Sequence, residues 1–198
     1  MAGQRSVIVT RWNATSTRER TELATLLTAY HLQTEAENGN PVTSVDALPE
    51  KYLSEIADPQ TAFDGDDVLI ARSENHAAGC LVITRRTDLR LEIKRLWTDP
   101  DYRGRRIATS LLTQAQAHAA RVDAEAIQLS VWEWRSDAIA LYKRTGFRET
   151  PSWEERDQLI CMVRSVQPDS QRRARLPSAH SPSWLRIGTR RQPASVSA

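Results

Sequence analysis

The sequence predicts an α+β fold, in which helices flank both faces of a mixed, largely antiparallel twisted sheet. Three observations support this prediction. Three strand-like segments follow one another directly between residues 66 and 98. The first two are joined by a short, hairpin-like connection, which favours antiparallel pairing. The whole order is one strand, two helices, three strands, a helix, a strand, a helix and two strands, and a mixed order of this kind is typical of α+β proteins.

The first two elements are a strand and a long helix. Residues 6–12 (SVIVTRW) alternate and are rich in branched side chains, as strands are. Ser16 and Glu19 have the spacing of a capping box, and apolar residues then follow at helical spacing. We therefore expect a helix that runs to about Glu35 and is broken by the sequence NGNP at residues 38–41.

A shorter helix and three strands come next. Apolar spacing over residues 48–56 predicts a helix that ends before Asp58-Pro59. Residues 66–72 and 77–86 predict the two hairpin strands. Residues 89–98 predict a third strand, which ends at Asp99-Pro100 because proline has no N–H to donate to a sheet.

Helices and strands alternate in the second half of the domain. Residues 107–121 have one apolar face and predict a helix. Residues 126–132 (AIQLSVW) predict a strand. Another helix begins at about Ser136 and stops at Gly146, a residue common just after helix ends.

The predicted domain ends at residue 166. Residues 158–166 predict a last strand, paired with a segment around residues 147–153. Beyond it the periodicity stops, so we expect one domain over residues 1–166 and a disordered basic tail over residues 167–198. The tail has six arginines and one aspartate, and the rest of the chain is therefore acidic although the net charge is +2. Arginines without helical periodicity support only weak, salt-sensitive attraction, so we expect no nucleic-acid partner.

The composition, with 40% apolar and 26% charged residues, is that of an ordinary soluble protein. No apolar run approaches the roughly 20 residues of a membrane-spanning helix, and the N-terminus lacks a signal-peptide core, so we expect a cytoplasmic protein without a membrane partner. Cys80 and Cys161 lie in apolar runs, which favours two buried free thiols over a disulfide. No Cys/His cluster has metal-ligand spacing, and we expect no metal.

Residues 102–112 (YRGRRIATSLL) concentrate positive charge where a helix begins. A helix start leaves backbone N–H groups unpaired, and the helix dipole favours an anion there. Gly104 allows close approach of the backbone, and Arg103, Arg105 and Arg106 add charged donors. This pattern favours a phosphate-bearing ligand over the alternative, a solvated basic turn.

The segment LEIKRLWTDPDYRGRRIATSLL (residues 91–112), followed by AIALYKRTGF (138–147), resembles the GNAT superfamily of acyl-CoA-dependent N-acetyltransferases. The resemblance spans roughly residues 6–166 and is strongest over residues 91–147. It implies a GNAT-like fold and acetyl-CoA as co-substrate. The family's pyrophosphate loop reads Arg/Gln-x-x-Gly-x-Gly/Ala, and here Arg106 replaces the central glycine.

The resemblance also implies roles for individual residues. The strand Leu96-Trp97-Thr98 would be splayed from its neighbour and pair with the pantetheine arm, with the Leu96 N–H holding the acetyl carbonyl. Tyr142 would protonate the leaving thiolate, although by its spacing alone it is a core aromatic. Arg135 stands where the family often has a cofactor-binding asparagine. The pyrophosphate would be held by Arg103, Gly104, Arg105, Arg106, Ile107, Ala108 and Thr109.

The acceptor side is less defined. Glu92 lies eleven residues before Arg103, where some family members place a general base. The alternatives are a glutamate on a solvated strand face or one paired with Lys94. In the family the region between the first two helices shapes the acceptor site, which here points to Tyr30, Glu35 and Glu37 as substrate-binding residues, the two acids attracting a cationic amine.

The expected activity is transfer of an acetyl group from acetyl-CoA to a primary amine, by direct attack in a ternary complex. We expect a small-molecule acceptor rather than a protein. The alternative is a catalytically degenerate acyl-CoA-binding sensor or regulatory module, because Arg106 and Arg135 depart from the family pattern. A homodimer is an alternative to a monomer. His31 is expected to be a packed or surface residue rather than a catalytic one.

Overall fold

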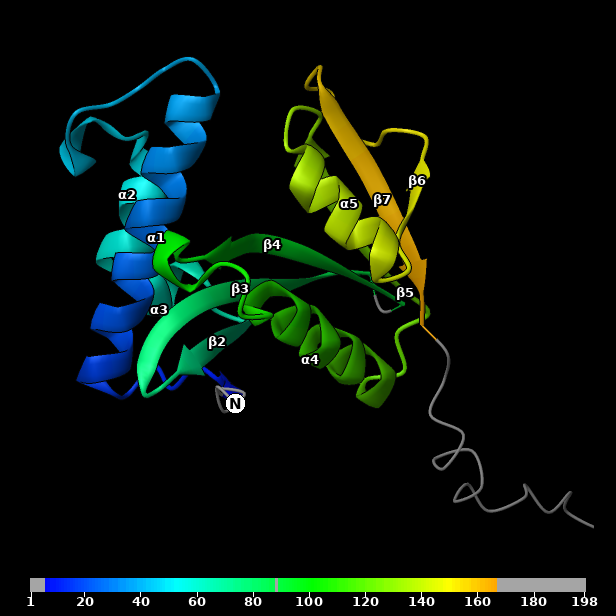
Figure 1. The fold of residues 1–198 in the computed structure, drawn as a ribbon, viewed down its shortest axis with the longest axis horizontal. Coiled ribbons are helices and arrows are strands. Elements are labelled where there is room, and N and C mark those ends of the chain that lie inside the picture. Colours follow the sequence, from blue (N-terminus) through cyan, green and yellow to red (C-terminus); the bar gives the residue numbers. More distant parts are fainter. Residues whose placement is uncertain (1–5, 88, 167–198) are drawn as a thin grey trace, which may run out of the picture. The chain divides into compact units, whose positions relative to one another are not determined.

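The computed structural model describes residues 6–87 and 89–166, which form a seven-stranded sheet flanked by helices (Figure 1). The strand order is β1-β2-β3-β4-β5-β7-β6, and only the β4–β5 pair is parallel. The predicted fold class is therefore confirmed. The predicted tail, residues 167–198, lies outside the described residues, and the domain boundary at residue 166 stays a prediction. Within residues 6–87 and 89–166 no helix is both long and apolar enough to cross a membrane.

The strands are β1 (Val7–Arg11), β2 (Asp67–Ser73), β3 (His76–Thr87), β4 (Arg90–Thr98), β5 (Ala126–Trp132), β6 (Arg148–Thr150) and β7 (Leu159–Ser165). The α-helices are α1 (Thr17–Glu37), α2 (Glu50–Ala57), α3 (Pro59–Ala62), α4 (Ile107–Arg121) and α5 (Ser136–Arg144). Two short 3-10 turns are η1 (Val45–Ala47) and η2 (Pro100–Tyr102).

The start of α1 follows the predicted cap in part. The Ser16 side chain accepts a hydrogen bond from the Glu19 N–H at 3.3 Å, as an N-cap residue does. The Glu19 carboxylate does not return this bond to Ser16 but accepts one from the Asn13 N–H at 2.7 Å. The helix continues two residues beyond the expected end, to Glu37, and Gly39 then takes a left-handed conformation with φ of 81°.

The second helical region contains an element that was not predicted. The helix expected over residues 48–56 appears as α2, and α3 follows it directly. The Asp58 side chain accepts a hydrogen bond from the Thr61 N–H at 3.3 Å, and Pro59 occupies the first turn, where its missing N–H costs nothing. The Asp-Pro pair that ends one helix therefore also starts the next.

The connection between β2 and β3 is the expected hairpin. Glu74 and Asn75 form the turn with φ of 52° and 68°. Two consecutive left-handed residues are the mark of a type I′ turn, whose twist matches that of the paired strands. Both cysteines, Cys80 and Cys161, are buried free thiols, as the sequence predicted.

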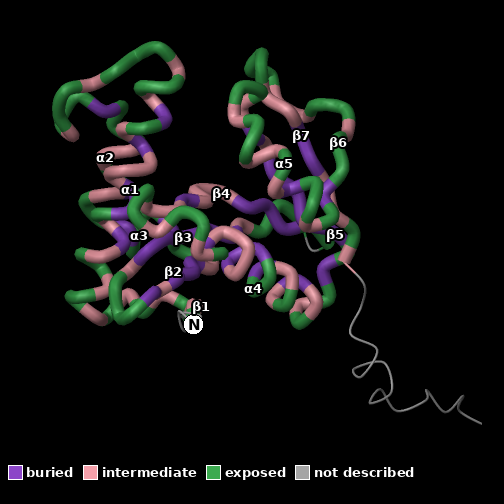
Figure 2. Tube along the Cα trace, in the orientation of Figure 1, coloured by how far each residue is buried: buried purple, intermediate pink, exposed green. Residues whose placement is uncertain are grey.

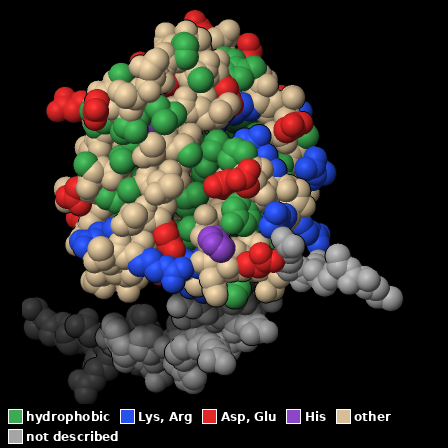
Figure 3. Space-filling view, turned by 60° about the vertical axis from the view of Figure 1, so that its left-hand side comes forward, with side chains coloured by type: hydrophobic (Ala, Val, Ile, Leu, Met, Phe, Trp, Pro, Cys, Tyr) green, Lys and Arg blue, Asp and Glu red, His purple; other side chains and the backbone are tan. Residues whose placement is uncertain are grey.

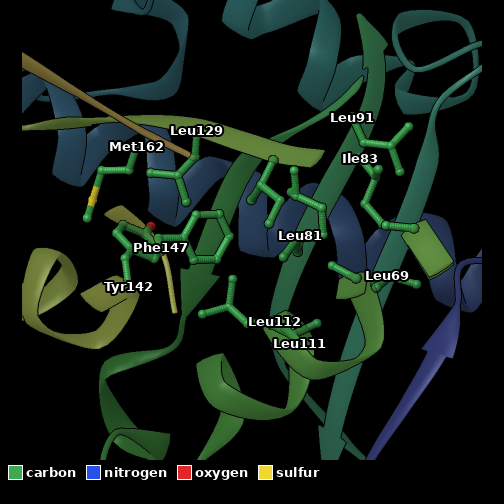
Figure 4. Close-up of a cluster of buried hydrophobic side chains, with 14 of the residues drawn as sticks. Leu69, Leu81, Ile83, Leu91, Leu111, Leu112, Leu129, Tyr142, Phe147 and Met162 are labelled. Atoms are coloured by element: carbon green, nitrogen blue, oxygen red, sulfur yellow. The ribbon is translucent and has the colours of Figure 1, made fainter. Parts of the chain in front are cut away.

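Alternate residues of each strand point to opposite sides of the sheet. In the central strands the residues on both sides are buried. In Figure 2 the buried residues concentrate in the strands and on the helix faces turned toward them. Figure 4 shows Leu111 and Leu112 of α4 below Leu81, with Tyr142 beside Phe147. A second cluster on the opposite face joins α1 to the sheet and contains Leu23, Leu26, Leu27, Phe63, Val68, Ile70, Cys80, Val82 and Trp97. Helices therefore cover both faces of β2–β4.

Candidate functional site

The parallel strands β4 and β5 pair over only three residues. Their register joins residues 90–92 to residues 126–128 and ends there, while β5 continues to pair with β7 on its other edge as far as Trp132. The two strands therefore separate, as the resemblance implied. A cavity of about 540 Å³ is lined by residues of both strands beyond this point, among them Leu96 of β4 and Val131 of β5. We call it the first cavity.

A bulge interrupts β4 where the strand borders this cavity. Arg95 and Leu96 together occupy one position opposite Leu81 of β3, because the neighbouring pairs involve Lys94 and Trp97. Arg95 has a left-handed φ of 52°. A bulge reverses the alternation of side chains that follow it. Leu96 consequently packs against the α4 side of the sheet, whereas Trp97 belongs to the α1 side.

The turn before α4 exposes backbone donors. Gly104 and Arg106 are both left-handed, with φ of 75° and 65°, and such residues in tight turns form anion-binding concavities. Arg106 is the N-cap of α4, and no side chain caps this end. The first helical bond runs from the Ser110 N–H to the Arg106 carbonyl at 2.9 Å. The N–H groups of residues 107–109 have no partner among the described residues, so an anion can bind them.

Gly79 of β3 allows α4 to start close to the sheet, and sequence reasoning missed this role. A Cβ at Gly79 would lie 2.5 Å from the Trp97 carbonyl oxygen and 2.7 Å from Cγ2 of Ile107. Real Cβ atoms do not approach other atoms so closely. The glycine thus lets the first turn of α4 lie directly against β3 and β4.

Two arginines of the turn lie over aromatic rings. The Arg103 guanidinium is 5.9 Å from the centre of the Trp97 ring, and that of Arg105 is 4.9 Å from the Tyr102 ring. Arg106 is exposed and has no such contact among the described residues. These contacts restrain two of the three predicted phosphate-binding side chains.

Tyr142 reaches the first cavity from α5. Its ring is buried and meets Phe147 edge to face, with 5.9 Å between ring centres. Its hydroxyl makes no hydrogen bond to any residue in the described part of the chain. Burial raises the pKa of the phenol, Tyr30 adds to the rise, and the positive charge of Arg135 opposes it. The phenol therefore keeps its proton at neutral pH.

Glu92 lines the same cavity from β4 and is only 5% exposed. It therefore does not lie on a solvated strand face, which was one of the alternatives. One carboxylate oxygen, Oε2, is 3.5 Å from both Lys94 Nζ and Arg86 Nε, so the pairing with Lys94 is present. At this length these contacts are not hydrogen bonds, and Oε2 has no hydrogen-bond partner among the described residues.

A buried ionic network beside the bulge was not predicted. Arg95 donates to both oxygens of Glu55 in α2, at 2.7 and 2.6 Å, and His31 Nε2 lies 2.9 Å from the same carboxylate. Tyr30 and Tyr52 flank the Arg95 guanidinium, with ring centres 5.7 and 5.6 Å away. The one available signal was Glu55 itself, an acid within the apolar spacing of the predicted helix.

The charges of this network follow from its burial and its hydrogen bonds. Burial alone would raise the pKa of Glu55, but the hydrogen bonds from Arg95 and His31 outweigh it and lower this pKa to about 2. Burial lowers the pKa of His31, against the opposing hydrogen bond to Glu55. Because the carboxylate only accepts hydrogen bonds, a neutral His31 carries its proton on Nε2. His31 is thus a packed residue, as expected.

The predicted acceptor residues are separated by the structure. Tyr30 lines the first cavity, whereas Glu35 lines neither that cavity nor the next one. Glu37 accepts a hydrogen bond from Arg135 Nε at 2.6 Å, and Arg135 Nη2 donates to Thr34 Oγ1 at 2.9 Å. These bonds join the last turn of α1 to the segment before α5. Glu37 lines a second cavity of about 500 Å³, together with Trp97, Arg103 and residues 134–138.

The predicted cofactor residues divide between these two cavities. Leu96, Thr98 and Ala108 line the first cavity, and Trp97 and Arg103 line the second. Both cavities are lined by Arg135, so they lie next to each other along the opening between β4 and α5. Gly104, Arg105, Arg106, Ile107 and Thr109 line neither cavity and belong to the turn and the first turn of α4.

Comparisons with known proteins agree with this architecture. Residues 28–147 match the model of the acetyltransferase (GNAT) family. An uncharacterized N-acetyltransferase of Methanocaldococcus jannaschii is 40% identical over 58 residues, which cover 29% of this chain and 26% of that protein. The matched segment thus spans about a quarter of the length of this curated relative.

Solved structures share the fold. An N-acetyltransferase from Thermoplasma acidophilum, solved with coenzyme A, superposes with a TM-score of 0.64 and 16% identity, covering 81% of this chain and 99% of that one. A GNAT-family acetyltransferase from Staphylococcus aureus gives a TM-score of 0.62 and 15% identity, covering 82% and 100%. At these identities the likeness concerns the fold alone.

Proposed function

Since the chain belongs to the acetyltransferase (GNAT) family, we propose that it moves an acetyl group from acetyl-CoA to a primary amine by direct attack in a ternary complex. One observation carries the proposal. β4 separates from β5 beside a cavity that both Leu96 and Tyr142 line. A cavity of about 540 Å³ has the size of small-molecule sites, which supports a small acceptor rather than a protein. The buried free thiols of Cys80 and Cys161 support a cytoplasmic location.

The residues at this opening fit acetyl-CoA as co-substrate. Backbone groups of residues 93–98 that point toward β5 have no strand partner there, so they suit the amides of a pantetheine arm. The unpaired N–H groups of residues 107–109 suit the diphosphate, as do the side chains of Arg103, Arg105 and Arg106. When bound, acetyl-CoA supplies the thioester that the amine attacks.

Two groups of the chain respond to the charges of this reaction. As the amine nitrogen bonds to the thioester carbon, the carbonyl oxygen becomes negative, and the Leu96 N–H donates to it. As the carbon–sulfur bond breaks, the sulfur takes the electron pair and the Tyr142 hydroxyl gives it a proton. Because the pKa of Tyr142 is raised, its hydroxyl carries a proton at neutral pH.

Glu92 takes the proton that the amine loses, directly or through water. An alkylammonium has a pKa of about 10.4 and cannot attack until it is deprotonated. Glu92 is buried in the first cavity, and its Oε2 accepts no hydrogen bond from a described residue. The Oε2 atom is therefore suited to accept an amine proton. The ionic contacts of Glu92 with Lys94 and Arg86 support a structural role in addition to the role of base.

Calorimetry and a thiol-release assay test the proposal together. We expect coenzyme A to release heat on titration into the folded protein, and acetyl-CoA to release free thiol when an accepted amine is added. An absence of heat would overturn the proposal. Binding of coenzyme A without turnover across a broad panel of amines would favour the alternative, an acyl-CoA-binding regulatory module.

A further inference from the structure

Apart from the Arg95–Glu55 pair and Arg135, the lining of the first cavity has an apolar part and a charged part. Near Leu96 and Tyr142 the lining is mainly apolar, with Ala108, Leu129 and Ala138. Five other segments supply charged side chains: α2, the residue before β2, the end of β3, the first half of β4 and the segment before β7. This charged part of the cavity consists of Lys51, Asp66, Arg86, Glu92, Lys94, Glu154 and Arg156.

Two of the three acids in the charged part have cationic neighbours within the described chain, and the third, Asp66, has a hydroxyl partner. Asp66 accepts a hydrogen bond from Thr84 Oγ1 at 2.9 Å. Glu154 accepts one from Ser130 Oγ and one from Arg156 Nη2, both at 2.9 Å. The third acid, Glu92, is in ionic contact with Lys94 and Arg86. Glu154 and Glu92 thus have cationic neighbours, whereas Asp66 is bonded only to a neutral hydroxyl among the described residues.

The cations of the charged part are not fully compensated. Arg86 and Lys94 share the single carboxylate of Glu92, with both contacts at 3.5 Å. Lys51 lines the cavity from α2 and has no ion-pair partner among the described residues. Arg86 and Lys94 are 51% and 38% exposed, so a ligand can reach them. The excess is local, because acidic and basic side chains are interspersed on the face shown in Figure 3.

Two residues that line the cavity each have a buried polar atom without a hydrogen-bond partner among the described residues. Glu92 Oε2 is an acceptor without a hydrogen-bond partner, which suits an ammonium group. Trp153 Nε1 is a donor without a partner in the described chain, and Trp153 lines the same cavity. An indole N–H can only donate, so it suits a carboxylate or phosphate oxygen. Together the two atoms suit a ligand that carries both an ammonium and an acidic group.

We propose that the amine acceptor carries an acidic group of its own, a carboxylate or a phosphate, which binds among Lys51, Arg86, Lys94 and Trp153. The inference deepens the proposed function and rests on it for the acetyl transfer. Glu92 then receives the ammonium end of the same molecule. Diamines and polyamines are disfavoured, because their second positive charge would meet a part of the cavity where cations outnumber acids.

Matched amines test this proposal. Free amino acids are compared with their carboxamides, and O-phosphoethanolamine with ethanolamine, so that each pair differs only in the acidic group. 1,3-Diaminopropane carries a second cationic group in place of the acidic one, and we expect it to be a poor acceptor. A hydrogen bond to a charged group contributes about 1.5–3 kcal/mol, so we expect the preferred acid to exceed its neutral partner by about 10-fold or more in kcat/KM. The amino-acid and phosphate arms show which acid is used.

Two substitutions and a matched control locate the effect. Lys51→Gln and Lys94→Gln are expected to lower the acid-to-neutral ratio of the preferred pair. Arg90→Gln removes an exposed charge from the same strand as Lys94 but outside both cavities, and the ratio should stay unchanged. A wild-type protein that uses neutral or cationic amines as well as acidic ones would overturn the inference and leave the proposed function intact.

Binding measurements separate the two proposals. Each amine is titrated by calorimetry into protein saturated with coenzyme A, which requires no chemical step. If no amine is acetylated but the acidic members bind more tightly and Lys51→Gln removes the difference, acetyl transfer fails while the inference holds. Equal affinity for the acidic and neutral members of every pair overturns the inference.

Discussion

Arg95 in the bulge of β4 and Glu55 in α2 form a two-point ion pair, with both N–O distances below 2.8 Å. The pair joins residues 40 positions apart in the chain. It ties the strand that borders the first cavity to a helix on the α1 side of the sheet. Because both side chains are largely buried, each needs the other to offset the cost of leaving water.

The first prediction concerns the acid stability of this pair. The pKa of Glu55 is lowered from 4.5 to about 2, so above pH 4.5 the folded state gains stability that it loses as the pH falls toward 2. At about 1.4 kcal/mol per pKa unit the loss is about 3 kcal/mol. His31, whose pKa is also lowered, adds a loss that begins as the pH falls through 6.5.

Urea denaturation between pH 7 and pH 3 measures the larger part of the Glu55 loss, about 2 kcal/mol. Glu55→Gln should be less stable at pH 7 by about 3–5 kcal/mol, since it leaves Arg95 without its ionic partner. It should also show a flatter profile below pH 4.5. Glu50→Gln, at an exposed position of the same helix, serves as the control. Parallel profiles for wild type and Glu55→Gln would contradict the assignment.

The second prediction concerns the turn before α4. Arg106 adopts a left-handed φ of 65°, which costs a non-glycine residue about 1 kcal/mol. Arg106→Gly should therefore raise the free energy of unfolding by up to about 1 kcal/mol while weakening coenzyme A binding. Gly104→Ala should lower stability by about 1 kcal/mol, because Gly104 has φ of 75°. A Cβ there meets no atom within 4 Å, so this loss comes from the backbone conformation and not from a clash. The melting temperature should therefore rise in Arg106→Gly and fall in Gly104→Ala. A change in the same direction in both variants would refute this prediction.

The third prediction concerns the close approach at Gly79. Gly79→Ala places a methyl group against the Trp97 carbonyl and Ile107, both of which are backbone or core atoms with little freedom to move. We expect a loss of about 1–3 kcal/mol in stability, as for other overpacked sites, and weaker coenzyme A binding because the start of α4 shifts. Gly39→Ala is the control. Gly39 has φ of 81° and a Cβ there meets no atom within 4 Å, so this variant shows the backbone cost of alanine without a steric clash. A Gly79→Ala protein with normal stability would rule out the close packing.

The fourth prediction concerns Tyr142. Its hydroxyl makes no hydrogen bond within the described chain, so Tyr142→Phe should leave stability and coenzyme A affinity nearly unchanged. Loss of a general acid typically lowers turnover by about 100-fold or more. Because the pKa of Tyr142 is raised, the wild-type rate should show no loss from tyrosine ionisation below pH 10. Unchanged turnover in Tyr142→Phe at neutral pH would remove the residue from this role.

The fifth prediction distinguishes two roles of Arg135. If Arg135 only joins α1 to the segment before α5, both Arg135→Gln and Glu37→Gln should leave coenzyme A binding unchanged. Arg135→Gln should lower stability more, because it removes the bond to Thr34 Oγ1 as well as the 2.6 Å bond to Glu37. If Arg135 also binds the cofactor, only Arg135→Gln should weaken coenzyme A binding, by about 10-fold for one charged hydrogen bond. Titration calorimetry on both variants decides between these outcomes.

Local patterns predicted most elements and some of their ends. The helix expected over residues 107–121 has these bounds in the structure, because its apolar face and its Gly-Arg start are both local signals. The α3 helix was missed, since it depends on one side-chain bond of Asp58 to Thr61. The bulge at Arg95 was missed too, because two residues can share one position in a ladder only when the partner strand is in place.

The sequence by itself determined the family resemblance, the fold class and the basic turn at residues 103–106, since these depend on residue types at short spacing. Only the tertiary structure decided that His31, Glu55 and Arg95 meet, and that Glu37 faces Arg135 rather than the first cavity. These partners lie 24 to 98 residues apart. Their contacts depend on where α1 and α2 rest on the sheet, and that position is set by packing of many side chains at once rather than by any local pattern.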